Sequence, residues 1–444
     1  MSTSQTGALL TDPTLRMYAR RVMLFFAILA SGGNLLFPKA ILYAGFIGPA
    51  LMLRHPSELL KPSHRHIWLF IAGFLLIAFI GFISGSTGGF AGRFLAILGG
   101  WLVLSVYVHE RKETLAADLT LILRLFAFQA IATFVLALVI PSEFRPYVLI
   151  EGELEYRSIA LIFTYHDPSS LISIFKRPNG FFWEPGVFQI YLNLFLYLGL
   201  FRRRSLSDGA LAIVALFTLQ STTGLLIASL ICVAYAAERW SAASAAQRFL
   251  LLSAVPIFLG PTLVITSLNT QEKLYGETRG SAVARQYDAE AGLNVALRYP
   301  LFGVGLDNER YAQEMLRYGD PRTTVKTSRA EARTTSNGVM ELMGLLGIPF
   351  ALVVFLGLAR QRFFRHKWLI GAAFFMTFIG ETLILTPFFL AIILSGFLIP
   401  NVARAVRRRV PDNVAPATPG YSAGVGKRTR AAHRKSRSMA VRKA

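Results

Sequence analysis

The sequence predicts an all-α polytopic membrane protein with about twelve transmembrane helices. Apolar residues make up 54% of the 444 positions, and the mean hydropathy is +0.49. A water-soluble chain of this length could not bury so much apolar surface, whereas a bilayer-embedded helix bundle need not. The apolar residues are also grouped into segments near the roughly 20 residues that a helix needs to cross a bilayer.

Twelve apolar segments follow one another along the chain. We expect membrane spans near residues 20–36, 38–53, 66–84, 90–108, 118–140, 186–201, 207–220, 222–237, 249–268, 337–359, 367–383 and 385–400. The first segment, in which Arg20 and Arg21 precede VMLFFAILA, also resembles a signal peptide. An uncleaved first helix is the simpler interpretation, because many further spans follow it.

The positions of the basic residues predict that both termini lie in the cytoplasm. With twelve spans, the basic connections, such as the one holding Arg202 to Arg204, all fall on the inner side, as the positive-inside bias requires. The tail 401–444 holds 12 Lys and Arg but a single acid, Asp412. This bias, together with anionic lipid headgroups, explains the formal charge of +21, so we expect no nucleic-acid partner.

Two segments on the outer side are long enough to carry function. Residues 1–400 are expected to form one transmembrane domain that includes outer loops at 141–185 and 269–336, and the basic tail 401–444 is expected to be disordered. Within the second loop the spacing predicts an amphipathic helix over 282–298, ended by Pro300. Its apolar positions are Ala284, Tyr287, Leu293, Ala296 and Leu297. Such a helix could instead simply lie on the bundle or the membrane surface.

The segment RPNGFFWEPG, from Arg177 to Gly186, is the main functional pattern in the chain. Arg177 could bind phosphate oxygens through two hydrogen bonds, and Glu184 could take a proton from a sugar hydroxyl. The aromatic residues, Trp183 among them, suit the headgroup level of a membrane. The alternative interpretation is an interfacial aromatic belt with a structural ion pair of Arg177 and Glu184.

Further charged residues are expected near the same outer face. Arg285 lies near the start of the predicted amphipathic helix, and Arg279 lies shortly before this helix. Arg93 and Glu381 fall near the outer ends of spans, where a charge needs a cavity or a partner, so they could contact substrate or form structural pairs.

Several chemistries are not supported by any motif. The chain has no P-loop, no G-x-G-x-x-G and no H-E-x-x-H, and the outer loops contain no acidic or histidine cluster with metal-ligand spacing. We therefore expect no cofactor and no metal in the reaction. The lone cysteine, Cys232, excludes an intrachain disulfide framework.

Three stretches, in this order, resemble the O-antigen polymerase and ligase superfamily, in particular its exopolysaccharide polymerase branch. They are RPNGFFWEPGVFQIYLNLFL, then Arg285 followed by LNVALRYPLFGVGLDN, and finally TTSNGVMELMGLLGIPFAL. Arg177, Glu184 and Arg285 match charged positions of these motifs, while Pro300, Gly303, Gly305, Asn337 and Gly347 match the turn and third motifs. Ligases of the superfamily commonly carry His-Asn where this chain has Ser336-Asn337, and this departure argues against a ligase.

The resemblance implies a metal-independent glycosyltransferase with a GT-C-like membrane fold in the bacterial inner membrane. Its substrates would be oligosaccharides carried on undecaprenyl diphosphate, its partners a flippase and a chain-length regulator, and bundle crevices could admit the lipid tails. Glu184, Arg177 and Arg285 would be catalytic, and Arg93, Arg279, Trp183, Asn337 and Glu381 would bind substrate. We therefore expect a repeat-unit polymerase of a secreted polysaccharide; the alternatives are a ligase of finished glycan and a transporter or flippase of lipid-linked sugars.

Overall fold

The computed structural model describes most of the chain up to residue 398. The described residues are 10–33, 37–61, 64–85, 89–150, 154–167, 176–246, 248–249, 260, 262–268, 270–271, 279–318 and 335–398. They belong to one compact unit, Met1–Leu398. The predicted tail at 401–444, most of the predicted span at 249–268, and part of the loop at 269–336 lie outside the described residues.

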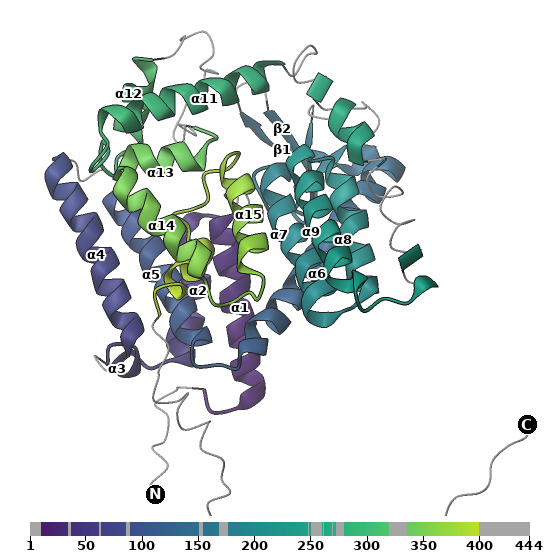
Figure 1. Ribbon diagram of the computed structural model, residues 1–444, viewed down its shortest axis with the longest axis horizontal. Helices are drawn as coiled ribbons and strands as arrows, with labels where there is room; N and C mark the ends of the chain where they lie inside the picture. Colours follow the sequence, from purple (N-terminus) through teal and green to yellow (C-terminus); the bar gives the residue numbers. More distant parts are fainter. Residues whose placement is uncertain are drawn as a thin grey trace, which may run out of the picture. The chain divides into compact units, whose positions relative to one another are not determined.

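Helices build nearly all of this unit (Figure 1). Before the first long loop they are α1 (Pro13–Ser31), α2 (Lys39–Leu53), the short α3 (Pro56–Leu59), α4 (Arg65–Ser84), α5 (Phe90–Tyr107) and α6 (Lys112–Val139). After it come α7 (Pro185–Tyr197), a π-helical turn (Leu198–Arg203), α8 (Leu206–Leu219) and α9 (Thr222–Trp240). The remainder are α11 (Arg279–Arg298), α12 (Asn308–Leu316), α13 (Gly338–Leu346), α14 (Ile348–Arg360), α15 (Lys367–Phe378) and α16 (Pro387–Ser395).

The apolar helices indicate a membrane-embedded protein. In the part of the chain that the structure describes, four of them, within α4, α5, α6 and α9, are long and apolar enough to cross a bilayer by themselves. Four further apolar helices, α2, α8, α14 and α15, are shorter. Helices occupy the other eleven predicted spans, but most are too short to meet the length criterion.

The span predicted at 337–359 is two helices rather than one. Gly347 separates α13 from α14 and has a φ of +85°, a region that favours glycine. A Cβ at this position would lie 2.3 Å from the carbonyl oxygen of Leu301, so the neighbouring loop also requires glycine here. The break is therefore caused by the close approach of the loop that follows α11.

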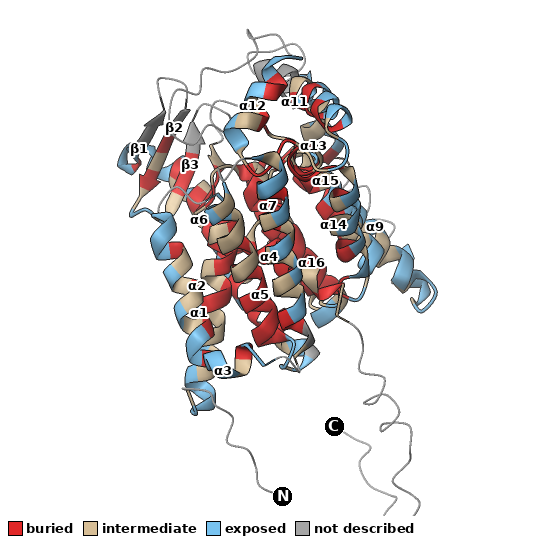
Figure 2. Ribbon diagram, turned by 90° about the vertical axis from the view of Figure 1, so that its left-hand side faces the viewer, coloured by how far each residue is buried: buried red, intermediate tan, exposed pale blue. Residues whose placement is uncertain are grey.

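The first long loop contains a four-stranded antiparallel sheet, which the prediction of an all-α protein missed. Its strands, in the order β1-β2-β3-β4, are Arg145–Ile150, Leu154–Ile159, Phe163–Asp167 and Arg177–Pro178. Tyr165 of β3 packs with Phe144 and Ala137, the latter near the end of α6. The sheet thereby attaches to the same end of the bundle as α11 and α12 (Figures 1 and 2).

The centre of the bundle is α7, which is buried along almost its whole length. Phe182, just before α7, is 1% exposed and stacks on Tyr191 at a ring-centroid distance of 4.8 Å. It also packs onto Gly32 at the end of α1, where a Cβ would clash with the ring. The expectation of a headgroup-level aromatic is wrong for Phe182: this ring anchors the RPNGFFWEPG segment in the core.

The turn after α11 is bound to the end of α13. The N–H groups of Val304 and Gly305 donate to the carbonyl oxygens of Gly344 and Leu345 at 2.8 and 3.1 Å. Gly303 has a φ of +65°, and a Cβ there would lie 2.3 Å from the carbonyl carbon of Leu345. These bonds satisfy carbonyl groups that a helix end leaves unpaired. The glycines of the PLFGVG and GLLG stretches thus join two motifs to each other.

The amphipathic helix predicted over 282–298 is present as the longer α11. Ala296 is buried as expected, but Leu293 and Leu297 are 43% and 60% exposed. The face that packs on the bundle instead includes Ala291 and Val295. Figure 1 shows α11 lying across one end of the bundle, which we call the α11 end.

Candidate functional site

Arg177 is positioned by the sheet and by the end of α8. In β4 it pairs with His166 of β3, and the next residues, Asn179 and Gly180, donate their N–H groups to the carbonyl of Thr164. The Arg177 side chain is half-buried, and its Nε donates to the carbonyl oxygen of Leu219 at 3.0 Å. Because Leu219 ends α8, this carbonyl is at the negative end of a helix dipole, a favourable place for a cation.

Arg177 lies within electrostatic range of both Glu184 and Arg285. Burial lowers the pKa of Arg177 from its ordinary value to about 10, the attraction of Glu184 acts in the opposite direction, and the like charge of Arg285 lowers it further. The three residues predicted to be catalytic, from β4, the start of α7 and α11, are therefore brought together at the α11 end.

Two carboxylates meet at the first turn of α7. Glu184 is the N-cap residue of this helix, and its carbonyl accepts from the N–H groups of Val187 and Phe188. A Cβ on Gly186 would lie 2.7 Å from Oε1 of Glu381 and 2.9 Å from Oε1 of Glu184. Both carboxylates thus flank Gly186, at a helix N-terminus that favours negative charge. Glu381 itself is 3% exposed and lies in the 379–386 connection between α15 and α16.

The N-terminus of α13 and the middle of α11 close the site around Glu381. A Cβ on Gly338 would lie 2.4 Å from the main-chain oxygen of Glu381, so α13 begins directly against this residue. Nη1 of Arg285 would lie 4.0 Å from a Cβ on Gly380, the residue before Glu381. Arg285 therefore neighbours Glu381 as well as Arg177.

Asn337 acts as a helix cap in the structure. It is 5% exposed, and its Oδ1 accepts from the N–H of Met340 at 3.1 Å, which caps α13. The side chain therefore has a structural role, and its role in substrate binding stays a prediction.

Asp288 is a site residue that the sequence prediction did not include. It lies one helical turn after Arg285 on α11, and its Oδ2 accepts from both the N–H and the Oγ of Ser336, each at 2.6 Å. These bonds fix the segment that leads into Asn337. The spacing of three residues between Arg285 and Asp288 on an expected helix is the signal that could have indicated a shared face.

Three predicted substrate-binding residues remain: Arg93 forms structural pairs, the side chain of Arg279 is not described, and Trp183 lies next to Glu184. Arg93 Nη2 donates to Oδ1 of Asn308 at 3.0 Å and pairs with Glu341 at 3.4 Å, which ties α5 to α12 and α13. Arg279 begins α11, and its side chain is not among the described ones. Trp183 adjoins Glu184, and its carbonyl accepts from the hydroxyl of Tyr156 at 2.9 Å.

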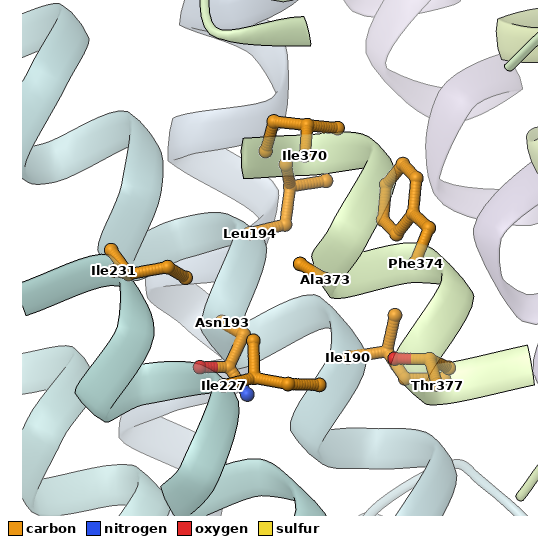
Figure 3. Close-up of a pocket in the computed structure, with 9 residues that line it drawn as sticks. All are labelled: Ile190, Asn193, Leu194, Ile227, Ile231, Ile370, Ala373, Phe374 and Thr377. Atoms are coloured by element: carbon orange, nitrogen blue, oxygen red, sulfur yellow. The ribbon is translucent and has the colours of Figure 1, made fainter. Parts of the chain in front are cut away.

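One apolar crevice lies beneath the site, between α7, α9 and α15 (Figure 3). Its lining residues are Ile190, Asn193, Leu194, Ile227, Ile231, Ile370, Ala373, Phe374 and Thr377. Its volume is about 10 Å³, room for about one water molecule. The expectation that a bundle crevice admits a lipid tail is thus not met by this crevice, because the side chains fill it.

The site combines two cations with two carboxylates at one end of an apolar bundle. Such an arrangement can bind an anionic group through the guanidinium groups and accept a proton on a carboxylate. No protein-family model matches this chain, and no curated protein or solved structure matches it significantly.

Proposed function

We propose that this chain is a polymerase of a secreted polysaccharide in the bacterial inner membrane. It would transfer a growing glycan from undecaprenyl diphosphate onto a new lipid-linked repeat unit. The observation that supports the proposal most strongly is that Arg177 and Arg285, from segments far apart in the sequence, lie within electrostatic range of each other beside Glu184 and Glu381. Two like charges held together suit a substrate with more than one negative charge, such as a diphosphate.

The residues of the site can serve each part of a glycosyl transfer. The bond between the anomeric carbon and the diphosphate oxygen breaks, and a bond from an acceptor hydroxyl oxygen to that carbon forms. Arg177 and Arg285 would stabilise the negative charge that develops on the leaving diphosphate. Glu184 would accept the proton of the acceptor hydroxyl, and Glu381, across Gly186, would orient that hydroxyl.

The orientation that we propose places the α11 end in the periplasm and both termini in the cytoplasm. The sheet, α11 and α12 would then face the compartment where lipid-linked units are polymerised. Twelve spans and a GT-C-like arrangement are part of this proposal. Apolar bundle helices would hold the polyprenyl chains in the bilayer, outside the filled crevice of Figure 3.

The proposal can be tested with purified protein in liposomes that contain lipid-linked repeat units. Arg177→Gln and Arg285→Gln should each slow polymerisation by about 100- to 1,000-fold, the effect typical of losing one group that stabilises developing negative charge. Matched controls are Arg145→Gln, in the same sheet, and Arg298→Gln, on the same helix; Arg145 is exposed, and Arg298 contacts Tyr318 instead. Long polymer at a normal rate in both site variants would refute the assignment.

A ligase is the nearest alternative activity. Loss of a ligase leaves long polymer on undecaprenyl diphosphate, whereas loss of a polymerase leaves single repeat units, so analysis of the lipid-linked products separates the two. At the position where ligases commonly carry histidine, Ser336 donates its hydroxyl to Asp288. This residue acts as a tether in the structure, which favours the polymerase.

A different feature of the structure supports a second candidate function, the transport of lipid-linked sugars. The helix pair α13–α14 is interrupted at Gly347, and interrupted apolar helices are typical of transporters. Liposomes loaded with labelled lipid-linked units on one side discriminate the two functions. A transporter would move the unit across the membrane without lengthening the glycan, whereas a polymerase would lengthen it.

A further inference from the structure

At the end of the bundle opposite α11, three histidines lie close together, two at the start of α4 and one after the end of α5. His64 is the N-cap residue of α4, His66 lies in the first turn of the same helix, and His109 follows the end of α5. One ring nitrogen of each lies within 4.8 Å of the other two. Figure 1 shows this end of α4 beside α3, far from α11.

The distances and donor types match a transition-metal site. Nδ1 of His64 and Nε2 of His109 are 3.2 Å apart and form a hydrogen bond, which a metal ion bound between them would replace. Two nitrogens bound to one tetrahedral ion at ~2.0 Å would be separated by about 3.3 Å. Neutral imidazoles are ligands that suit Zn²⁺, Cu²⁺, Ni²⁺ and Co²⁺, whereas Mg²⁺ and Ca²⁺ prefer oxygen. His109 is exposed, so the cluster is open to solvent on this side.

His66 supplies an independent observation. It is 4% exposed, and its buried Nε2 has no hydrogen-bond partner among the described residues. A buried polar nitrogen without a partner is unfavourable by about 1–3 kcal/mol, and coordination to a metal ion would satisfy it. The ring also lies 6.1 Å from that of Trp101, so an apolar side chain shields one side of the cluster.

The surrounding charges allow a divalent cation to bind. Arg54 is close enough to His66 to interact with it, but Glu58 and Glu110 both attract Arg54, and Glu58 also faces His64. The basic groups around the histidines are therefore accompanied by carboxylates.

We propose that His64, His66 and His109 bind one divalent transition-metal ion, with Zn²⁺ as the representative ligand. The described residues offer no fourth ligand, so water would occupy the remaining position. This site is separate from the sugar chemistry proposed for the α11 end and does not depend on it.

The position of the site indicates a clamp on α4. This helix is the most exposed of the four long spans: 17% of the residues in its apolar segment are buried, against 56% for α5 (Figure 2). Its α11 end is already held, because Nη1 of Arg310 donates to the carbonyl of Ser84 at 2.6 Å. A metal ion would hold its other end to the turn that follows α5.

The test uses the full chain in detergent, purified through a tag that contains no histidine and then stripped of metal with a chelator. Zn²⁺ is titrated by calorimetry, and Co²⁺ is added to record the visible absorption of a nitrogen-ligated tetrahedral ion. Cu²⁺ should also quench the fluorescence of Trp101, and Trp101→Phe identifies the contribution of this residue among the five tryptophans.

The variants are His109→Gln, whose exposed side chain makes misfolding least expected, and His66→Gln. The controls are His55→Gln, which lies close by but outside the cluster, and His366→Gln. We expect one Zn²⁺ per chain, a higher Tm with the ion, and affinity reduced by more than about 100-fold in His109→Gln, because even residues that only support a ligand contribute 10- to 100-fold. Equal affinity in wild type and His109→Gln, or equal loss in His55→Gln, would overturn the proposal.

Discussion

Two clusters of charged residues in this bundle differ in how their charges are balanced. On α6, Asp118 is 1% exposed and accepts from Nε of Arg20 at 2.5 Å, Nε of Arg21 at 3.0 Å and the hydroxyl of Tyr107 at 3.1 Å. At the α11 end, by contrast, Arg177 is attracted by Glu184 but repelled by a second cation, Arg285, and burial lowers the pKa of Arg177 to about 10.

We interpret the first cluster as structural and the second as the candidate functional site. The partners of Asp118 lie on regular helices and contact it directly, so the cluster joins α1, α5 and α6. The charged residues of the α11 end lie on β4, at the start of α7, on α11 and in the 379–386 connection, and the two arginines repel each other. Such an arrangement costs stability in the empty protein, and an anionic ligand would relieve the repulsion, a trade-off that is common at functional sites.

The largest effect on stability is expected for Asp118→Asn. The change leaves two arginines without their buried counter-ion, and removing one partner of a buried ion pair typically costs about 3–5 kcal/mol. The measurement is unfolding in detergent micelles, with the exposed Glu143→Gln as control. A variant as stable as wild type would show that this cluster is not structural, and the comparison would fail.

A loss of activity without loss of fold is also expected for Gly186→Ala. The new methyl group would displace the carboxylates of Glu184 and Glu381, whose flexible ends can move without disturbing the backbone. A misplacement of about 1 Å can reduce a rate about 100-fold. Polymerisation rate and Tm are measured together, and Gly92→Ala is the control because nothing lies within 4 Å of its Cβ position. Parallel loss of rate and Tm would contradict this prediction.

A smaller effect on stability than that of Asp118→Asn is expected for Glu184→Gln, which removes the charge that attracts Arg177. We expect a loss of about 1–3 kcal/mol in the free energy of unfolding, because a partly buried cation loses its partner. In an Arg177→Gln background the same change should cost little, since the cation is already absent. Equal costs in both backgrounds, measured by a double-mutant cycle, would show that the two residues do not interact.

The lowered pKa of Arg177 shows whether its charge raises or lowers the stability of the fold. An arginine in the unfolded chain holds its proton more tightly than Arg177 does in the fold, so its charge lowers stability in full below about pH 10. This cost disappears as the pH rises from about 10 towards the ordinary pKa of an arginine. Arg177→Gln should therefore not lower Tm at pH 7 through the lost charge, in contrast to Asp118→Asn.

The smallest effect is expected for Ser336→Ala. The variant loses the hydroxyl bond to Asp288 but keeps the bond from the main-chain N–H, so a cost of about 1 kcal/mol follows. Hydrogen exchange of the segment before α13 should rise, while Ser336→Thr should preserve the protection. Unchanged exchange in Ser336→Ala would show that the tether does not order this segment.

Much of the fold was predictable because helix formation in a bilayer depends on local pattern. The starts of α4, α5, α7, α8 and α9 lie within one residue of the predicted spans, since polar, charged, Gly or Pro residues border each apolar run. The break at Gly347 was not predicted, because it depends on the approach of Leu301 from another segment. The sheet was missed although LEYRSI and FTYHD carry aromatic and β-branched residues typical of strands.

For the site, the sequence predicted which residues are involved but not which other residues they contact. RPNGFFWEPG indicated Arg177 and Glu184 because a charged, glycine-hinged segment beside an apolar helix is unusual. The pairing of Arg93 with Glu341 and the bond of Ser336 to Asp288 join segments far apart in sequence. The same holds for His64, His66 and His109, whose spacing along the chain does not suggest a shared ion.

The sequence by itself determined that the chain is an apolar helix bundle and which charged residues are unusual in it, because hydropathy and turn chemistry act over a few residues. Only the tertiary structure decided which of those charges meet. Packing of the loops onto the helix ends brings Arg177, Glu184, Arg285 and Glu381 together, and burial of Arg177 lowers the pKa of its guanidinium group. Electrostatic interactions depend on distance in space, which spacing along the chain does not specify.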